Sequence, residues 1–152
     1  MKEIHGITMP RIEGLKRIGI DSMLFIYLLE DHPDFSDTVS SILKDVESGE
    51  MTGVTSVITL LEILVKPKMD HNVSAIEDYK NILSNFPNLE IVHVDNKIAD
   101  IASTLRADYG IKTPDAIQVA TSIKEGCSAF LTNDLALKKI KEIRVITLRD
   151  II

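Results

Sequence analysis

The chain has 152 residues, of which 45% are hydrophobic and 26% are charged, which is typical of one globular domain and excludes a disordered or fibrous chain. Its formal net charge of −6 argues against a general nucleic-acid coat, although it permits a nuclease whose acidic site binds divalent cations. No apolar run approaches the roughly 20 residues that cross a bilayer, the N-terminus does not resemble a secretory signal, and Cys127 has no cysteine partner. We therefore expect a cytoplasmic protein without membrane association.

Short β-forming runs alternate with helical segments along the chain. We predict five strands, over about 17–21, 53–56, 89–94, 127–131 and 143–148. Amphipathic spacing and capping residues predict helices between them, over about 22–30, 35–46, 57–65, 73–86, 95–110, 113–126 and 135–140. This alternation indicates an α/β fold, a three-layer α/β/α arrangement with a five-stranded parallel sheet.

The chain 1–152 is predicted to be a single domain with a core over about 17–148. Residues 1–16 contain two glycines and a proline, so we expect a loosely ordered arm or a short edge element there. Asp34 or Ser36 is the predicted N-cap of the second helix, and Pro67 follows the predicted end of the third.

Four acids lie at comparable points of the predicted fold. Asp21 ends the first strand, Glu62 lies on an apolar helix, Asp115 opens a helix and Asp134 follows the fourth strand. The carboxyl ends of parallel strands are where ligands bind in such folds. Mg²⁺ and Mn²⁺ prefer oxygen ligands, and two such ions can clamp the oxygens of a phosphodiester displacement. A shared divalent-metal site is therefore one interpretation of this pattern.

Each acid also has a simpler interpretation. Asp115 after a proline and Asp134 before a helix are common capping positions, and Asp21 alone can be a turn residue. Glu62 is harder to explain as surface, because its helix is almost entirely apolar and an acid is seldom buried without a partner. The residues by themselves leave both interpretations open.

Four short motifs contain these acids, in the order Gly19-Ile20-Asp21-Ser22, Thr59-Leu60-Leu61-Glu62-Ile63, Lys112-Thr113-Pro114-Asp115-Ala116-Ile117-Gln118-Val119-Ala120 and Phe130-Leu131-Thr132-Asn133-Asp134. In this order and context they resemble the PIN domain family, a nuclease fold that includes the VapC-type toxins of toxin–antitoxin pairs. The resemblance covers about residues 17–148. One departure is Met23, since many members have Asn or another small residue there, and this change removes no ligand.

The resemblance implies a ribonuclease that hydrolyses RNA phosphodiester bonds with Mg²⁺ or Mn²⁺. The metal ligands and catalytic acids that it implies are Asp21, Glu62, Asp115 and Asp134. The resemblance also implies that three residues support the site through hydrogen bonds, namely Ser22, Thr132 and Asn133. It also implies a homodimer and a cognate antitoxin that covers the acidic groove.

Four cations close in sequence to the acids are candidates for contact with RNA, namely Lys66, Lys68, Arg106 and Lys112. Each of them taken alone is better explained as a solvated surface cation. The four histidines show no metal-ligand spacing, and there is no glycine-rich phosphate loop.

Two other acidic α/β folds fail on position. A response-regulator receiver needs an acid pair after the first strand and a phospho-accepting Asp after the third, where Asp95 stands as a helix cap. A haloacid-dehalogenase-like phosphatase needs a second Asp two residues after Asp21, where the chain has Met23. The alternative that stays open is a PIN-like RNA- or protein-binding module with little or no catalysis.

Overall fold

The computed structural model describes residues 12–151, which form five strands and a helix or turn of helix after each of them. The strands are β1 (Arg17–Ile20), β2 (Thr52–Ser56), β3 (Leu89–Val92), β4 (Ala129–Thr132) and β5 (Arg144–Thr147). The helices are α1 (Ser22–Leu29), α2 (Ser36–Glu47), α3 (Ile58–Met69), α4 (Val73–Ser84), α5 (Asn96–Tyr109), α6 (Thr113–Lys124), the 3₁₀ helix η1 (Leu135–Lys139) and α7 (Leu148–Ile151).

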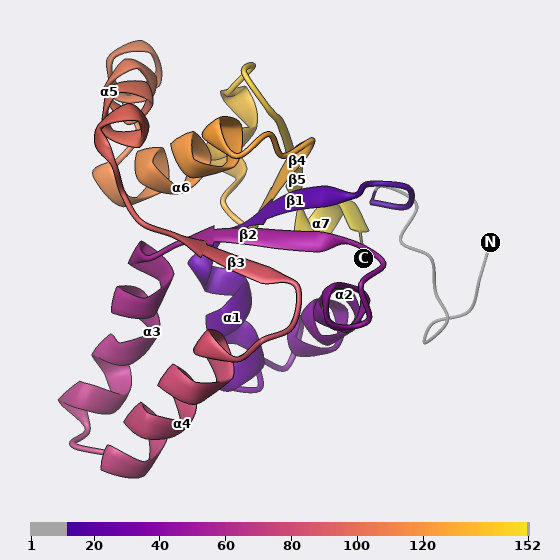
Figure 1. The fold of residues 1–152 in the computed structure, drawn as a ribbon, viewed down its shortest axis with the longest axis vertical. Helices are drawn as coiled ribbons and strands as arrows, with labels where there is room; N and C mark the ends of the chain where they lie inside the picture. Colours follow the sequence, from indigo (N-terminus) through magenta and orange to yellow (C-terminus); the bar gives the residue numbers. More distant parts are fainter. Residues whose placement is uncertain (1–11, 152) are drawn as a thin grey trace.

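The five strands form one parallel sheet in the order β3-β2-β1-β4-β5. Helices α5 and α6 cover one face, while α1, α2, α3 and α4 lie on the other (Figure 1). The predicted α/β class and three-layer arrangement are therefore confirmed. Because β1 lies between β2 and β4, the segments that leave these three strands begin side by side at one edge of the sheet.

Each face of the sheet has its own apolar core. Ile18 and Ile20 of β1 are fully buried against α1 and α2 on one face, and Phe130 of β4 packs against α5 and α6 on the other. Gly19 lies between them and faces α6 at very close range, because a Cβ atom there would stand 1.8 Å from the Oγ of Ser122. A glycine is therefore required for α6 to approach β1 as it does.

Helix α3 is longer than the sequence predicts. The prediction ends near Val65, but the helix continues through Pro67 to Met69. A proline in the last turn removes only one intrahelical hydrogen bond. The Pro67 ring is buried, and its carbonyl accepts a 2.9 Å hydrogen bond from the Asn72 backbone N–H. Burial therefore offsets the lost bond, and the predicted helix end is wrong by about one turn.

Two further boundaries differ from the prediction. Neither Asp34 nor Ser36 caps α2, since the preceding residue is the buried Phe35 and burial fixes the entry to the helix. The last strand ends at Thr147, because Asp150 in the first turn of α7 accepts hydrogen bonds from the Thr147 backbone N–H and hydroxyl, both at 3.0 Å. The arm predicted for residues 1–16 falls mainly outside the described residues, and Ile12 is buried in the first core.

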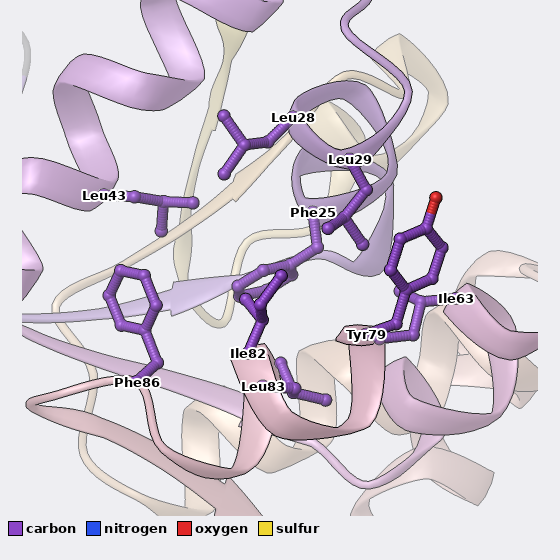
Figure 2. Close-up of a pocket in the computed structure, with 9 residues that line it drawn as sticks. All are labelled: Phe25, Leu28, Leu29, Leu43, Ile63, Tyr79, Ile82, Leu83 and Phe86. Atoms are coloured by element: carbon purple, nitrogen blue, oxygen red, sulfur yellow. The ribbon is translucent and has the colours of Figure 1, made fainter. Parts of the chain in front are cut away.

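A small apolar pocket lies where α1, α2, α3 and α4 meet (Figure 2). It is lined by Phe25, Leu28, Leu29, Leu43, Ile63, Tyr79, Ile82, Leu83 and Phe86. The pocket contains no charged side chain, so it offers a partner only apolar contact. No helix within residues 12–151 combines the length and apolarity that crossing a bilayer requires.

Candidate active site

The four predicted acids line one open cleft at the carboxyl ends of the strands. Asp21 follows β1 directly, Asp134 lies two residues beyond the end of β4, Glu62 is in the second turn of α3, and Asp115 is in the first turn of α6. The cleft has a volume of about 340 Å³, which leaves room for hydrated cations. Its other lining residues are Ser22, Met23, Tyr27, Thr132 and Asn133.

Asp21 is the most buried of the four acids, with 6% of its surface exposed. Its backbone N–H continues the sheet pairing by donating to the Leu131 carbonyl at 2.9 Å, and its Oδ2 accepts a 2.7 Å hydrogen bond from the Thr132 hydroxyl. Burial, together with the nearby charges of Asp115 and Glu62, raises the pKa of Asp21 from 3.8 to about 6 against the opposing effect of Thr132. This carboxyl is therefore held where its negative charge is costly.

Two hydroxyl groups connect the acids. The Ser22 Oγ donates to Oε1 of Glu62 at 2.5 Å and lies 3.5 Å from Oδ1 of Asp21. The Thr132 hydroxyl that donates to Asp21 also accepts a 3.1 Å hydrogen bond from the backbone N–H of Asp134. Ser22 and Thr132 thus orient carboxylates that come from distant parts of the chain.

Asp115 and Asp134 both line the cleft and are close enough for their charges to interact. Burial, followed by the charges of Asp134 and Glu62, raises the pKa of the half-buried Asp115, while Lys112 lowers it. Oδ1 of Asp134 accepts a 2.9 Å hydrogen bond from the Ala136 N–H, so the predicted capping role of this residue is present as well. The capping bond occupies one oxygen of Asp134 and leaves its other oxygen available to the cleft.

None of the four predicted RNA-contacting cations is among the residues that line the cleft. Lys66 lies 3.8 Å from Asp70 on the solvent side of α3, and Lys68 is exposed in the last turn of the same helix. The Arg106 guanidinium donates to the Ile111 carbonyl at 3.0 Å. Lys112 precedes α6 and is close enough to act on the pKa of Asp115, so it is the cation best placed near the acids.

Tyr27 is a cleft residue that the sequence reasoning missed. It lies one helical turn after Met23 on α1, so both side chains face the cleft. Its hydroxyl accepts a 3.1 Å hydrogen bond from Nδ2 of Asn133, and its ring packs on His32 and Phe35 with centroid distances of 4.7 and 5.1 Å. The four-residue spacing from Met23 is the signal that would have found it.

The donor set of the cleft suits a hard divalent cation. All the acidic donors are carboxylate oxygens, which favours Mg²⁺ or Mn²⁺ over a metal that prefers thiolate or imidazole. Within residues 12–151, no three carboxylate, imidazole or thiol side chains converge tightly enough to enclose an ion. Mg²⁺ usually keeps several waters and takes only one or two protein carboxylates, so a hydrated ion fits such a cleft without a closed cage.

The fold and the acidic cleft define an α/β domain with its site at the carboxyl edge of a parallel sheet. A comparison with models of protein families matches residues 18–143 to the PIN domain. The chain therefore belongs to the PIN domain family. A comparison with curated proteins gives no match.

Solved structures share this fold at low sequence identity. A toxin–antitoxin complex from Klebsiella pneumoniae is 22% identical, with a TM-score of 0.67 over 87% of this chain and 97% of that one. VapBC2 from Rickettsia felis, bound to a DNA fragment from its promoter, is 18% identical, with a TM-score of 0.70 over 86% and 98%. DNA-bound VapBC from Salmonella typhimurium is 20% identical, with a TM-score of 0.63 over 88% and 98%. At these identities, the comparison establishes the fold alone.

Proposed function

We propose that this protein is a divalent-metal-dependent ribonuclease that hydrolyses RNA phosphodiester bonds. The observation that carries the proposal is the meeting of four carboxylates in one open cleft, where none of them is ion-paired within the described residues. Burial, followed by repulsion between the acids, raises the pKa of Asp21 and Asp115, and a bound divalent cation would favour their ionised forms. Membership of the PIN domain family supports the same activity.

In this proposal, the acids of the cleft hold the metal ion and the hydroxyl residues orient the acids. Mg²⁺ or Mn²⁺ held by Asp21, Glu62, Asp115 and Asp134 would supply Lewis-acid activation of water and neutralise the charge that develops on the phosphate. With a pKa of about 6, Asp21 is mainly ionised at pH 7 and able to serve as a ligand. Thr132 fixes one oxygen of Asp21, and Ser22 fixes one oxygen of Glu62, so that the remaining lone pairs point to the cleft.

The direct test is cleavage of a mixed RNA pool by the purified protein in Mg²⁺ or Mn²⁺ and in chelator, beside Asp21→Asn. We expect chelator-sensitive cutting by the wild type and none by the variant. Equal cutting by both proteins would show that the activity does not arise in this cleft. Absence of cutting together with retained RNA binding would favour the alternative, a PIN-like binding module.

We also propose that the protein is the toxin of a toxin–antitoxin pair, with the antitoxin covering the acidic cleft. The support is the shared fold with structures described as toxin–antitoxin complexes. Induced expression of the wild type should arrest growth of the host, and expression of Asp115→Asn should not. Identical growth of the two cultures would contradict a toxic activity that depends on the cleft.

A homodimer is the third part of the proposal. Leu61, Val65 and Met69 follow one another at four-residue intervals on α3 and are 60%, 47% and 73% exposed. Such a ridge can pack against the same ridge of a second copy around a two-fold axis. Val65→Glu should halve the molar mass in light scattering, whereas Leu135→Glu, a substitution at another exposed apolar position, on η1, should leave it unchanged. Equal masses for wild type and Val65→Glu would exclude this surface.

A further inference from the structure

A chain of buried hydrogen bonds joins β1, β2, α3 and α6, which are elements that also carry or precede the cleft acids. Nε2 of Gln118 on α6 donates to the Thr59 hydroxyl on α3 at 2.9 Å. The Thr59 hydroxyl shares a 2.5 Å hydrogen bond with the hydroxyl of Thr55 on β2, which donates to the Ile20 carbonyl on β1 at 2.8 Å. These three side chains are at most 2% exposed, so no solvent replaces the bonds they make.

Three members of this hydrogen-bonded chain, Ile20, Thr59 and Gln118, lie within three residues of one of the acids. Ile20, whose carbonyl ends the chain, precedes Asp21. Thr59 lies three residues before Glu62 on α3, which places the two one helical turn apart. Gln118 lies three residues after Asp115 on α6 and so stands in the same relation to that acid. The hydrogen bonds therefore connect the three backbone segments that carry Asp21, Glu62 and Asp115.

The polar character of this contact is not needed for burial. An apolar side chain of similar volume at position 118 would fill the space without the cost of removing an amide from water. Both polar atoms of the amide are instead hydrogen-bonded, because its Oε1 also accepts a 3.2 Å hydrogen bond from the Ser56 backbone N–H. Directional bonds between α3 and α6 allow only one relative position of the two helices, whereas an apolar contact tolerates sliding.

We infer that Gln118, Thr59 and Thr55 are positioning residues that fix the spacing of Asp21, Glu62 and Asp115 and thereby set the affinity of the cleft for a divalent cation. This inference rests on the proposed metal dependence and adds residues that do not line the cleft. The carboxylates keep their own hydroxyl partners, Thr132 and Ser22, so the network acts on the elements rather than on the carboxylate oxygens.

The test is calorimetric titration of the purified, metal-free protein with Mn²⁺. Thr59→Val and Gln118→Met remove the link with little change of shape, and each should weaken Mn²⁺ binding about tenfold, the low end of the range for outer-sphere residues. The double variant should weaken Mn²⁺ binding by less than the two single effects combined, because both substitutions remove the same hydrogen bond between Gln118 and Thr59. Thr59→Ser keeps the hydroxyl and should bind Mn²⁺ as the wild type does.

Thr121→Val is the matched control for loss of a buried hydroxyl on α6. The Thr121 hydroxyl donates at 2.7 Å to the Ile117 carbonyl of its own helix and so makes no bond between helices. This variant should retain wild-type Mn²⁺ affinity, and urea unfolding of all variants would show that each is folded. Comparable instability of Thr121→Val and Thr59→Val with different Mn²⁺ affinities would separate positioning from stability.

Three results would overturn the inference. Wild-type affinity in both Thr59→Val and Gln118→Met would refute the positioning role while leaving the metal site intact. Equal weakening in Thr59→Ser and Thr59→Val would show that the hydroxyl is not responsible. No Mn²⁺ binding by the wild type would remove both this inference and the proposed metal dependence, so the two failures are distinguishable.

Discussion

Acidic side chains have opposite electrostatic surroundings at the amino and carboxyl ends of the strands. Near the start of β1, the Arg17 guanidinium binds both carboxylate oxygens of Glu90 at 2.7 and 2.8 Å and lies 3.2 Å from Glu125. At the carboxyl edge, Asp21 has hydroxyl partners and acidic neighbours but belongs to no ion pair within residues 12–151. Arg17 lowers the pKa of Glu90, whereas burial raises that of Asp21.

This difference separates acids that are ion-paired within the fold from the acids to which we assign the proposed chemistry. The charge of a carboxylate such as Glu90 is already balanced by Arg17, so this residue stabilises the fold and does not require a cation from solvent. Within residues 12–151 the carboxylates of the cleft have no ion-pair partner, and a cation from solvent would lower their repulsion. Composition alone does not distinguish the two sets, because both consist of ordinary Asp and Glu residues.

The largest effect is expected on cleavage of RNA. Asp115→Asn should lower the metal-dependent rate at least about 100-fold, because it removes a proposed ligand and several kcal/mol of electrostatic stabilisation in the transition state. Glu90→Gln, at the opposite edge, should cut RNA at the wild-type rate. The two variants are compared by their initial rates of RNA cleavage at saturating Mn²⁺. An equal loss of rate in both would contradict the distinction between the cleft acids and the ion-paired acids.

The next effect is a dependence of stability on pH in the presence of chelator. The folded chain holds the Asp21 proton more tightly than an unfolded chain, since its pKa rises from 3.8 to about 6. Stability should therefore increase by about 1 kcal/mol as the pH falls from 7 to 5, with Asp115 contributing in the same direction. Urea unfolding at pH 7 and pH 5 measures this change in the free energy of unfolding. Asp21→Asn should show a smaller increase, and an identical increase would assign it to other groups.

A smaller effect is expected at the paired edge. Glu90→Gln should reduce the free energy of unfolding by about 0.5–1 kcal/mol, because the pair is bidentate but partly exposed to solvent. High salt should diminish the difference between variant and wild type, since it screens an exposed pair. A variant as stable as the wild type in low salt would mean that Arg17 gains nothing from Glu90.

The smallest effect is expected for Cys127, which is partly buried against the core that contains Phe130. Burial raises the pKa of its thiol to about 12, so the reactive thiolate is scarce at neutral pH. Cys127→Ala should retain wild-type RNA cleavage, and alkylation of Cys127 in the folded protein should be slower than that of a free thiol. Inactivation by mild alkylation would contradict this assignment.

Much of the site follows from local sequence patterns. Asp21 and Asp134 come just after short apolar strands, and in a parallel sheet such positions meet at one edge. Asp115 follows a proline at the start of a helix, which fixes its place in the first turn. These relations depend on periodicity and helix-capping chemistry alone, so the residues themselves point to the edge of the sheet.

The parts that were not predicted depend on packing between distant segments. Pro67 continues α3 because its ring is buried, and the burial of a helix end is not visible in the local sequence. The bond between Gln118 and Thr59 requires α3 and α6 to be neighbours, which only the strand order determines. The ion pairs of Arg17 with Glu90 and Glu125 join residues 73 and 108 positions apart, so no sequence spacing indicates them.

The central claim is that the cleft carboxylates destabilise the chain until a divalent cation neutralises them. It is tested most directly by urea unfolding of wild type and Asp21→Asn at pH 7.5, in chelator and in Mn²⁺. In chelator the variant should be the more stable protein, because one buried negative charge is gone. In Mn²⁺ the order should invert, since only the wild type gains binding free energy. The same order of stability under both conditions would contradict the account.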